Sequence, residues 1–169
     1  MAFILLAVLA TAYACKKSSS SNFTCTPEKK TYTYQPGKQI DNQLLSTGDT
    51  LYEHYSYSIK DGDKNVFNFT LQFKDCPEIA DDEGARIILF EIPQNVQSFQ
   101  LKDSAGFRKA KSLLNYACFC APGGPVLIKS GSIEGEKKSN NTWHIKASSI
   151  TPLSGTNNTL AFEADFLLK

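Results

Sequence analysis

Net charge is nearly absent from this sequence. Its 18 Lys and Arg residues are balanced by 17 Asp and Glu residues, which gives a formal net charge of +1 at pH 7. No basic cluster exceeds a few residues, so the chain lacks the positively charged stripe that binds nucleic acid. We therefore expect no nucleic-acid partner.

Histidine is scarce, and it occurs only as His54 and His144. Neither lies in a known catalytic or zinc signature such as Gly-x-Ser-x-Gly or His-Glu-x-x-His. Strand alternation predicts both on polar strand faces, where exposed histidines are ordinary. A catalytic pair with an acid such as Glu53 or Asp165 is the competing hypothesis. We expect a non-enzymatic protein without a cofactor, and keep a hydrolase with an unrecognised site as an alternative.

Long hydrophobic runs are also missing, apart from the one between Ala2 and Ala14. Its length of about 13 residues suits the core of a signal peptide but is short of the roughly 20 that cross a bilayer as a helix. The run ends in Ala12-Tyr13-Ala14-Cys15, and the chain then turns polar with Lys16-Lys17-Ser18-Ser19-Ser20-Ser21. This layout predicts an export signal.

The end of that run resembles a lipobox, in which the cysteine is lipidated and becomes the mature N-terminus. The Lys-Lys-Ser segment after it is similar to the tethers of small envelope lipoproteins from the Bacteroidota. The resemblance implies a signal peptide over 1–14, a lipid anchor on Cys15, a flexible tether over 15–24 and a domain held outside the cytoplasm, with the outer membrane as the expected location. An ordinary secretory signal, cut after Ala14, is the alternative.

The five cysteines form an odd set in an exported protein. Lipidation of Cys15 would leave an even set in an oxidising compartment. Cys118 and Cys120 are alternate residues of a predicted strand, with Cα atoms ~6.6 Å apart and parallel Cβ vectors. Each is therefore expected to pair with Cys25 or Cys76. A zinc site is not expected, because Cys-x-Cys lacks the usual spacer and no histidine is close in sequence.

Period-two alternation of apolar residues runs through most of the remaining chain and predicts half-buried strands. Phe67, Phe69, Leu71 and Phe73 share one face, and Trp143 shares a core face with Ile145 and Ala147. The segment 86–92 is apolar on both faces, which predicts a central strand ending at Pro93. Strands are expected near 31–35, 49–59, 67–73, 86–92, 96–102, 112–120, 126–137, 142–148 and 159–168, with one short helix near 105–114.

Segments rich in Gly, Asn, Asp and Pro separate these strands and predict turns, for example at Asp61-Gly62-Asp63 and at Ser139-Asn140-Asn141. About eight strands at this spacing predict an all-β domain over 25–169, an antiparallel β-sandwich or flattened barrel. The last third, from the Gly131–Gly135 pattern Gly-x-Ile-x-Gly through Trp143, resembles the ending of Bacteroidota lipoproteins, which also implies a β-sandwich.

Two groups of residues are candidates for ligand binding. Tyr55 and Tyr57 alternate along one predicted strand and could stack on sugar rings if exposed, although ordinary sheet packing is the competing interpretation. The oxygen-bearing residues Asp61, Asp63 and Asn65 alternate as in a calcium loop, but the Gly and Glu of an EF-hand loop are missing, so a metal site is not expected. The sequence thus predicts a membrane-anchored binding or structural protein, with a glycan or an envelope protein as partner.

Overall fold

The computed structural model describes residues 25–46, 53–76, 84–117, 124–152 and 159–169. The elements are β1 (Lys29–Ser46), β2 (His54–Gln72), β3 (Ala85–Pro93), β4 (Ser98–Leu101), α1 (Ser104–Lys109), β5 (Leu113–Ala117), β6 (Val126–Leu127), β7 (Ser130–Ser139), β8 (Thr142–Thr151) and β9 (Leu160–Leu168). The described part of the chain therefore contains nine strands and one short helix, which confirms the all-β prediction.

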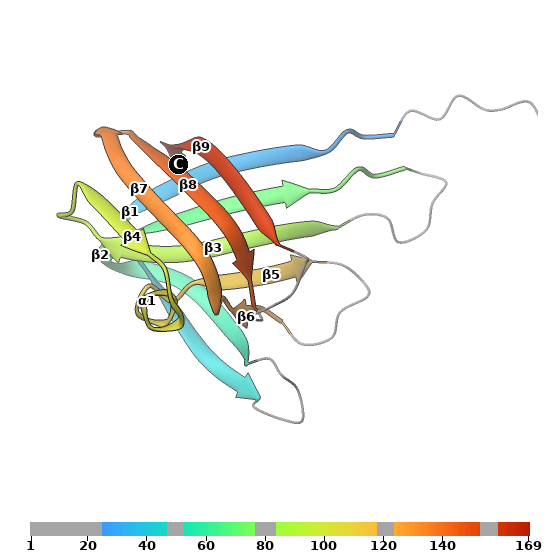
Figure 1. Cartoon of the computed structure of the whole chain (residues 1–169), viewed down its shortest axis with the longest axis horizontal. Helices are drawn as coiled ribbons and strands as arrows, with labels where there is room; N and C mark the ends of the chain where they lie inside the picture. The colour runs from blue at the N-terminus through green and yellow to red at the C-terminus, as the bar shows by residue number, and fades with distance from the viewer. Residues whose placement is uncertain (1–24, 47–52, 77–83, 118–123, 153–158) are drawn as a thin grey trace, which may run out of the picture.

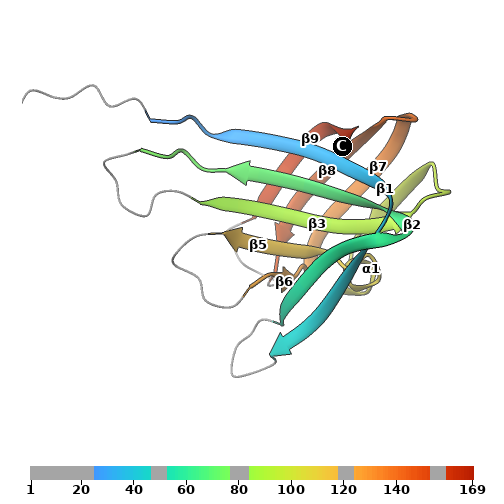
Figure 2. The same ribbon diagram turned by 180° about the vertical axis from the view of Figure 1, so that it is seen from behind.

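All nine strands belong to one sheet, in the order β3-β5-β6-β2-β1-β9-β8-β7-β4. Figure 1 shows β7, β8 and β9 crossing in front of the layer formed by β1, β2, β3 and β5, and Figure 2 shows the same two layers from behind. The layers are joined where β1 pairs with β9. That pairing is parallel, whereas the other described pairings are antiparallel, so it departs from the predicted antiparallel arrangement.

The end of the sheet opposite β4 is closed on itself. β2 pairs with β3 along its second half and with β6 at His54, and β5 bridges β3 to β6. These four strands therefore form a small ring. The fold combines the two alternatives that the sequence left open, because two layers pack face to face while one side curls into a barrel.

β2 runs through Asp61-Gly62-Asp63, where the sequence predicts a turn, so that prediction is wrong. At this point the partner strand β1 has Gly37 at φ +68°, a left-handed conformation that favours glycine. Lys38 of β1 faces both Asp61 and Lys64, so the intervening residues of β2 form a bulge. Bulges bend a strand without ending its hydrogen bonding. The turn-like composition therefore marks a bend in two long strands, not their end.

Aromatic side chains fill the space between the layers. Phe67 is fully buried, and its ring stacks on Phe90 at 5.0 Å between centroids and meets Trp143 edge-on at 5.5 Å. Phe166 of β9 contacts the same ring at 5.9 Å. The predicted core faces of β2 and β8 are thereby confirmed, since Phe67, Phe69, Trp143, Ile145 and Ala147 are all buried in one cluster.

The helix is shorter than the segment 105–114 predicted from the sequence. It begins after Asp103, whose carboxylate accepts a hydrogen bond from Gly106 N at 2.7 Å, and it ends at Lys109. Lys111 has φ +45°, and Leu114 lies in β5 with its side chain in the core. The part of the prediction that covers Lys111 and Leu114 is therefore wrong, because strand pairing with β3 overrides the weak helical period there.

A buried carboxylate braces the central strand β3. Glu91 is 6% exposed, and its Oε2 accepts a hydrogen bond from Ile40 N at 2.5 Å, while its Oε1 lies 3.1 Å from Lys111 Nζ. Lys111 Nζ in turn donates to Ile40 O. The buried charge is thus paired and hydrogen-bonded, as burial requires. This contact ties β1 to β3 beyond the bulge.

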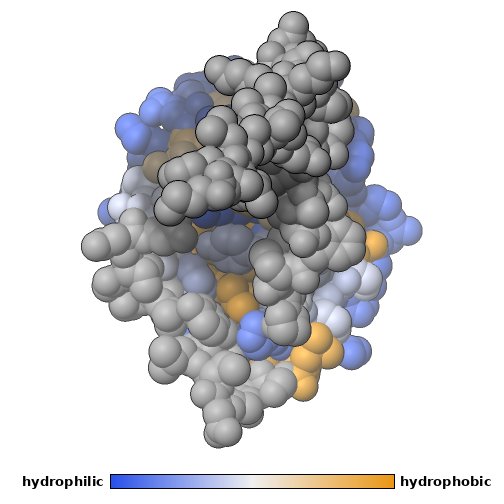
Figure 3. Space-filling view, turned by 90° about the vertical axis from the view of Figure 1, so that its right-hand side faces the viewer, coloured by the Kyte–Doolittle hydropathy of each residue, from blue (hydrophilic) through white to orange (hydrophobic). Residues whose placement is uncertain are grey.

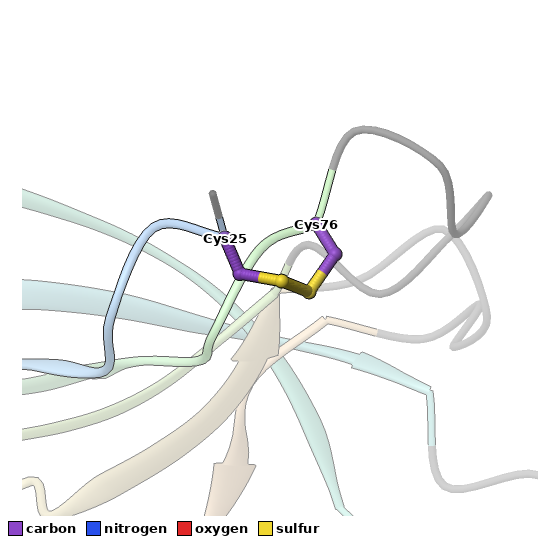
Figure 4. The surroundings of a disulfide bond; sticks show 2 residues. All are labelled: Cys25 and Cys76. Atoms are coloured by element: carbon purple, nitrogen blue, oxygen red, sulfur yellow. A yellow bond between two sulfur atoms is a disulfide. The ribbon is translucent and has the colours of Figure 1, made fainter. Parts of the chain in front are cut away.

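Cys25 and Cys76 form a disulfide at the open end of β1 and β2, as Figure 4 shows. The pairing register explains this partner. Lys29 faces Gln72, and the same register continued outward gives the bridge between Thr26 and Asp75, which exchange N–H···O bonds of 2.7 and 3.1 Å. The next pair outward is Cys25 and Cys76, in a non-hydrogen-bonded position where Cα atoms lie close, here 4.3 Å apart.

This bridge corrects the predicted pairing, in which Cys25 and Cys76 each bonded to Cys118 or Cys120. The candidates Cys25 and Cys76 are confirmed as disulfide cysteines, but they bond to each other. Residues Cys118 and Cys120 lie outside the described residues. Strand alternation around Cys118 and Cys120 does not give this partner, because the bridge follows from the register between β1 and β2.

Gly135 provides a test of the contact between the edge strand β4 and the core. It faces Phe99 across β7 and β4, and a Cβ atom at Gly135 would lie 2.3 Å from Phe99 Cε1. The Phe99 ring is held in turn by Phe90 and Trp143. Gly135→Ala is therefore expected to lower the free energy of unfolding by about 1–3 kcal/mol through overpacking. Urea denaturation measures this, with Lys138→Ala on the exposed side of β7 as control. A Gly135→Ala variant as stable as wild type would contradict the contact.

Candidate functional site

The outward face of β4, β7, β8 and β9 carries two rows of polar side chains. Alternation along β8 buries Trp143 and Ile145 and turns His144 and Lys146 outward. The strand registers then align one row of Ser98, Glu136, His144 and Asp165 and a second row of Gln100, Glu134, Lys146 and Glu163. We call these eight residues the polar grid.

His144 lies in the middle of the polar grid, between two carboxylates of β9. Its Nδ1 is 2.9 Å from Asp165 Oδ1, and its Nε2 is 3.3 Å from Glu163 Oε1. An imidazole can donate from both nitrogens only when it is protonated. Hydrogen bonds first to Asp165 and then to Glu163 raise the pKa of His144 above its ordinary value of 6.5. The geometry therefore favours a positively charged imidazolium.

The other members of the polar grid form cross-strand contacts of the same kind. Gln100 Nε2 donates to Glu134 Oε2 at 3.2 Å, and Lys146 Nζ lies 3.5 Å from Glu163 Oε2. Lys138, just beyond the grid, lies 2.6 Å from Glu136 Oε2. Each of these pairs is solvent-exposed, so its contribution to stability is small. The arrangement holds donors and acceptors in place more than it stabilises the fold.

A shallow pocket of about 410 Å³ lies over these rows. Every member of the polar grid except Asp165 lines it, together with Phe99 and Gly135. This size falls within the range of small-ligand sites. The pocket thus offers carboxylate acceptors, amide and lysine donors, and one imidazolium to a polar ligand.

The grid does not have the geometry of a Ser–His–Asp triad. Ser98 and His144 share a row, but β7 lies between their strands, which separates their backbones by about 10 Å. A nucleophile and its base need hydrogen-bond contact. In addition, both nitrogens of His144 already face carboxylates, so the ring is poorly suited to accept a proton.

Glu53, the other acid of the competing catalytic hypothesis, is held by hydrogen bonds from two side chains. Glu53 Oε1 and Oε2 receive a bidentate pair of hydrogen bonds from Arg108 at 3.1 and 3.2 Å, and Oε2 also accepts the Tyr55 hydroxyl at 2.7 Å. These bonds, led by that from Arg108, hold the pKa of Glu53 below its ordinary range. His54 has its Nδ1 3.3 Å from Gly124 O. Glu53 therefore anchors helix α1 to the start of β2.

The tyrosines proposed for glycan stacking lie on the inner face of the barrel. Tyr55 is 8% exposed and packs against Leu113 and Leu127, and Tyr57 is half-buried against the same cluster. A ring covered by protein cannot stack on a sugar, so the hypothesis is wrong for Tyr55. Sheet packing, the competing interpretation, is what the structure shows for this residue.

The calcium candidates do not form a loop. Asp61 lies 2.6 Å from Lys38 Nζ and Asp63 lies 2.8 Å from Lys64 Nζ, while Asn65 is buried in β2. In the described ranges, no group of three or more His, Cys, Asp or Glu side chains is placed to hold a metal ion. The lipidation candidate Cys15 lies outside the described residues.

Sequence reasoning identified His144 and Asp165 but missed their neighbours on β4 and β7. The sequence signal for them is the alternation of Glu134 and Glu136 around Gly135, which predicts a strand but not its neighbours. Which strands pair, and in which register, decides that these glutamates share a face with His144, and one sequence does not give that register.

Among the described residues, no helix has both the length and the apolar character needed to cross a membrane. No protein-family model matches this chain. Searches of curated proteins and of solved structures likewise find no match, so the polar grid itself is the basis for any functional assignment.

Proposed function

We propose that this chain is a lipid-anchored protein of a bacterial cell envelope, whose folded domain binds a partner through the polar grid and does not catalyse a reaction. The anchor rests on the lipobox-like Ala12-Tyr13-Ala14-Cys15. The disulfide between Cys25 and Cys76 supports an oxidising compartment, because structural disulfides persist there. Cys25, one end of this disulfide, directly follows the proposed tether over 15–24.

The binding role rests on one observation, the contact of both His144 ring nitrogens with carboxylates. A general base must be free to accept a proton, whereas an imidazolium held by Asp165 and Glu163 can only donate hydrogen bonds. The same property suits a recognition surface, in which fixed donors and acceptors meet complementary groups of a ligand. A hydrolase that uses His144 as its base gains no support from this geometry.

The anchor is tested by fractionating cells of a Bacteroidota host that express the wild-type chain or the Cys15→Ser variant. We expect the wild-type chain in the membrane fraction and the variant in the soluble exported fraction. A wild-type chain that stays soluble would rule out the lipid anchor. The Ser18→Ala variant is the matched control, since it changes a residue of the proposed tether but leaves the lipobox and the Cys25–Cys76 disulfide intact.

A glycan is the second candidate, as the ligand of the polar grid. Sugar hydroxyls both donate and accept hydrogen bonds, and the pocket of about 410 Å³ presents both kinds of group on a single surface. In this proposal the glycan binds over β4, β7, β8 and β9, on a different surface from Tyr55 and Tyr57.

Glycan arrays followed by calorimetry test this candidate. Glu134→Gln and Lys146→Ala are each expected to weaken binding of any glycan hit at least tenfold, because each removes a charged hydrogen-bonding group from the pocket. Lys60→Ala, an exposed change on β2 outside the grid, is expected to bind like wild type. Unchanged affinity in both grid variants would contradict glycan binding at this site.

The proposed imidazolium also predicts a pH dependence. Because the pKa of His144 is raised in the folded state, the stability that it contributes is complete below its unfolded value of 6.5 and is lost as the pH rises through the folded pKa. NMR titration of the His144 ring is expected to give a pKa above 6.5, and Asp165→Asn is expected to lower it. The His54→Gln variant assigns the signal. A wild-type pKa at or below 6.5 would contradict the contact with the two carboxylates.

A further inference from the structure

An arginine lies at one end of the core, beside the aromatic rings of Phe73 and Tyr116. The sequence has two arginines, Arg86 and Arg108, and Arg108 is held by Glu53. Within the described residues, Arg86 pairs with no carboxylate, and its Nε is buried without a hydrogen-bond partner. A half-buried charge without a counter-charge or full hydrogen bonding is unfavourable, so the position of the Arg86 guanidinium requires a physical reason.

Arg86 points toward the same side of β3 as the core. It alternates with Ile88 and Phe90, which are both fully buried between the two layers. Across the sheet it faces Leu71 on β2 and Tyr116 on β5, which are half-buried and border the core. Figure 3 looks onto this end of the molecule and shows described hydrophobic and hydrophilic residues next to one another.

Two aromatic rings fix the guanidinium. Its central carbon lies 5.6 Å from the centroid of Phe73 and 5.4 Å from that of Tyr116, within cation–π distance of both. Contact with the rings stabilises the charge but leaves Nε without a hydrogen-bond acceptor among the described residues. Arginine edges match a carboxylate through two parallel hydrogen bonds.

We propose that Arg86, clamped between Phe73 and Tyr116, binds the carboxylate of a ligand that has an apolar body. The guanidinium supplies the counter-charge, and the apolar surfaces of Leu71, Phe73 and Tyr116 contact the rest of the ligand. This site is separate from the polar grid, which faces outward on the other layer, so it adds a second ligand class to the proposed binding function.

Calorimetry with monomeric laurate tests the site, using the full chain with Cys15→Ser so that no detergent is needed. Laurate is expected to bind, whereas acetate, which lacks the apolar body, and dodecanol, which lacks the charge, are expected to bind at least tenfold more weakly. Arg86→Gln is expected to reduce laurate affinity at least tenfold, and Arg86→Lys to restore part of it. Lys74→Gln, which removes an exposed charge next to Phe73, is the control.

Equal laurate affinity in wild type and Arg86→Gln would overturn the proposal, as would equal binding of dodecanol. A second measurement avoids the risk that the variant misfolds. Phenylglyoxal modifies arginines, and peptide mapping of the wild-type chain is expected to show that laurate protects Arg86 from it. Arg108 serves as the internal reference. Modification of Arg86 that laurate does not slow would also overturn the proposal.

Discussion

Serine at Cys25 or Cys76 is expected to lower the free energy of unfolding by about 4 kcal/mol. The bridge joins residues separated by 51 positions, and the loss of chain entropy in the unfolded state on closing a loop of that length gives this magnitude. Urea denaturation under non-reducing conditions, in a Cys15→Ser background, measures the effect. The loss should appear as a lower midpoint of the transition.

The double variant Cys25→Ser/Cys76→Ser distinguishes the observed pairing from the alternatives. If the two cysteines bond to each other, removing both should cost about as much as removing either one, because the same bond is lost each time. If each were bonded to a different cysteine, as the sequence had predicted, the double variant would lose two bonds and be clearly less stable than either single variant.

Phe67→Ala is expected to have a similarly large effect, lowering the free energy of unfolding by about 3–5 kcal/mol. Phe67 is fully buried, and its ring contacts rings from both layers, including Tyr34, Phe90 and Trp143. Truncation would leave a cavity where the two layers meet, and surrounding rings in a packed core can collapse into it only in part. Thermal or urea unfolding provides the measurement.

Leu168→Ala is the matched control for this prediction, because it also truncates a large apolar side chain. Leu168 is 45% exposed near the end of β9, so its loss should change stability by less than about 0.5 kcal/mol. A Phe67→Ala variant that loses no more stability than Leu168→Ala would be incompatible with the aromatic core described above.

The core of this fold was predictable from the sequence because alternation carries that information directly. The faces of β2 and β8 that contain Phe67 and Trp143 follow from the period of two in each strand. Local composition was less reliable where tertiary pairing overrode it. Asp61-Gly62-Asp63 has the residues of a turn, yet β2 continues through it as a bulge opposite Lys38 of β1.

The candidate sites depend on register, which no single strand reveals. The alignment of Glu136 with His144 and Asp165 requires the pairings of β7 with β8 and of β8 with β9. The partner of Cys25 likewise follows from the register of β1 on β2. The clamp on Arg86 combines Phe73 and Tyr116, which are 43 residues apart in the sequence. Each site brings together residues whose proximity is set by long-range strand pairing.

Intact-mass analysis of the chain extracted from membranes is the most direct test of the proposed anchored binding protein. The account predicts a polypeptide that starts at Cys15 and carries a diacylglyceryl group on that sulfur, with or without a third acyl chain on the new amino terminus. An unacylated chain with a free thiol at Cys15 would contradict it.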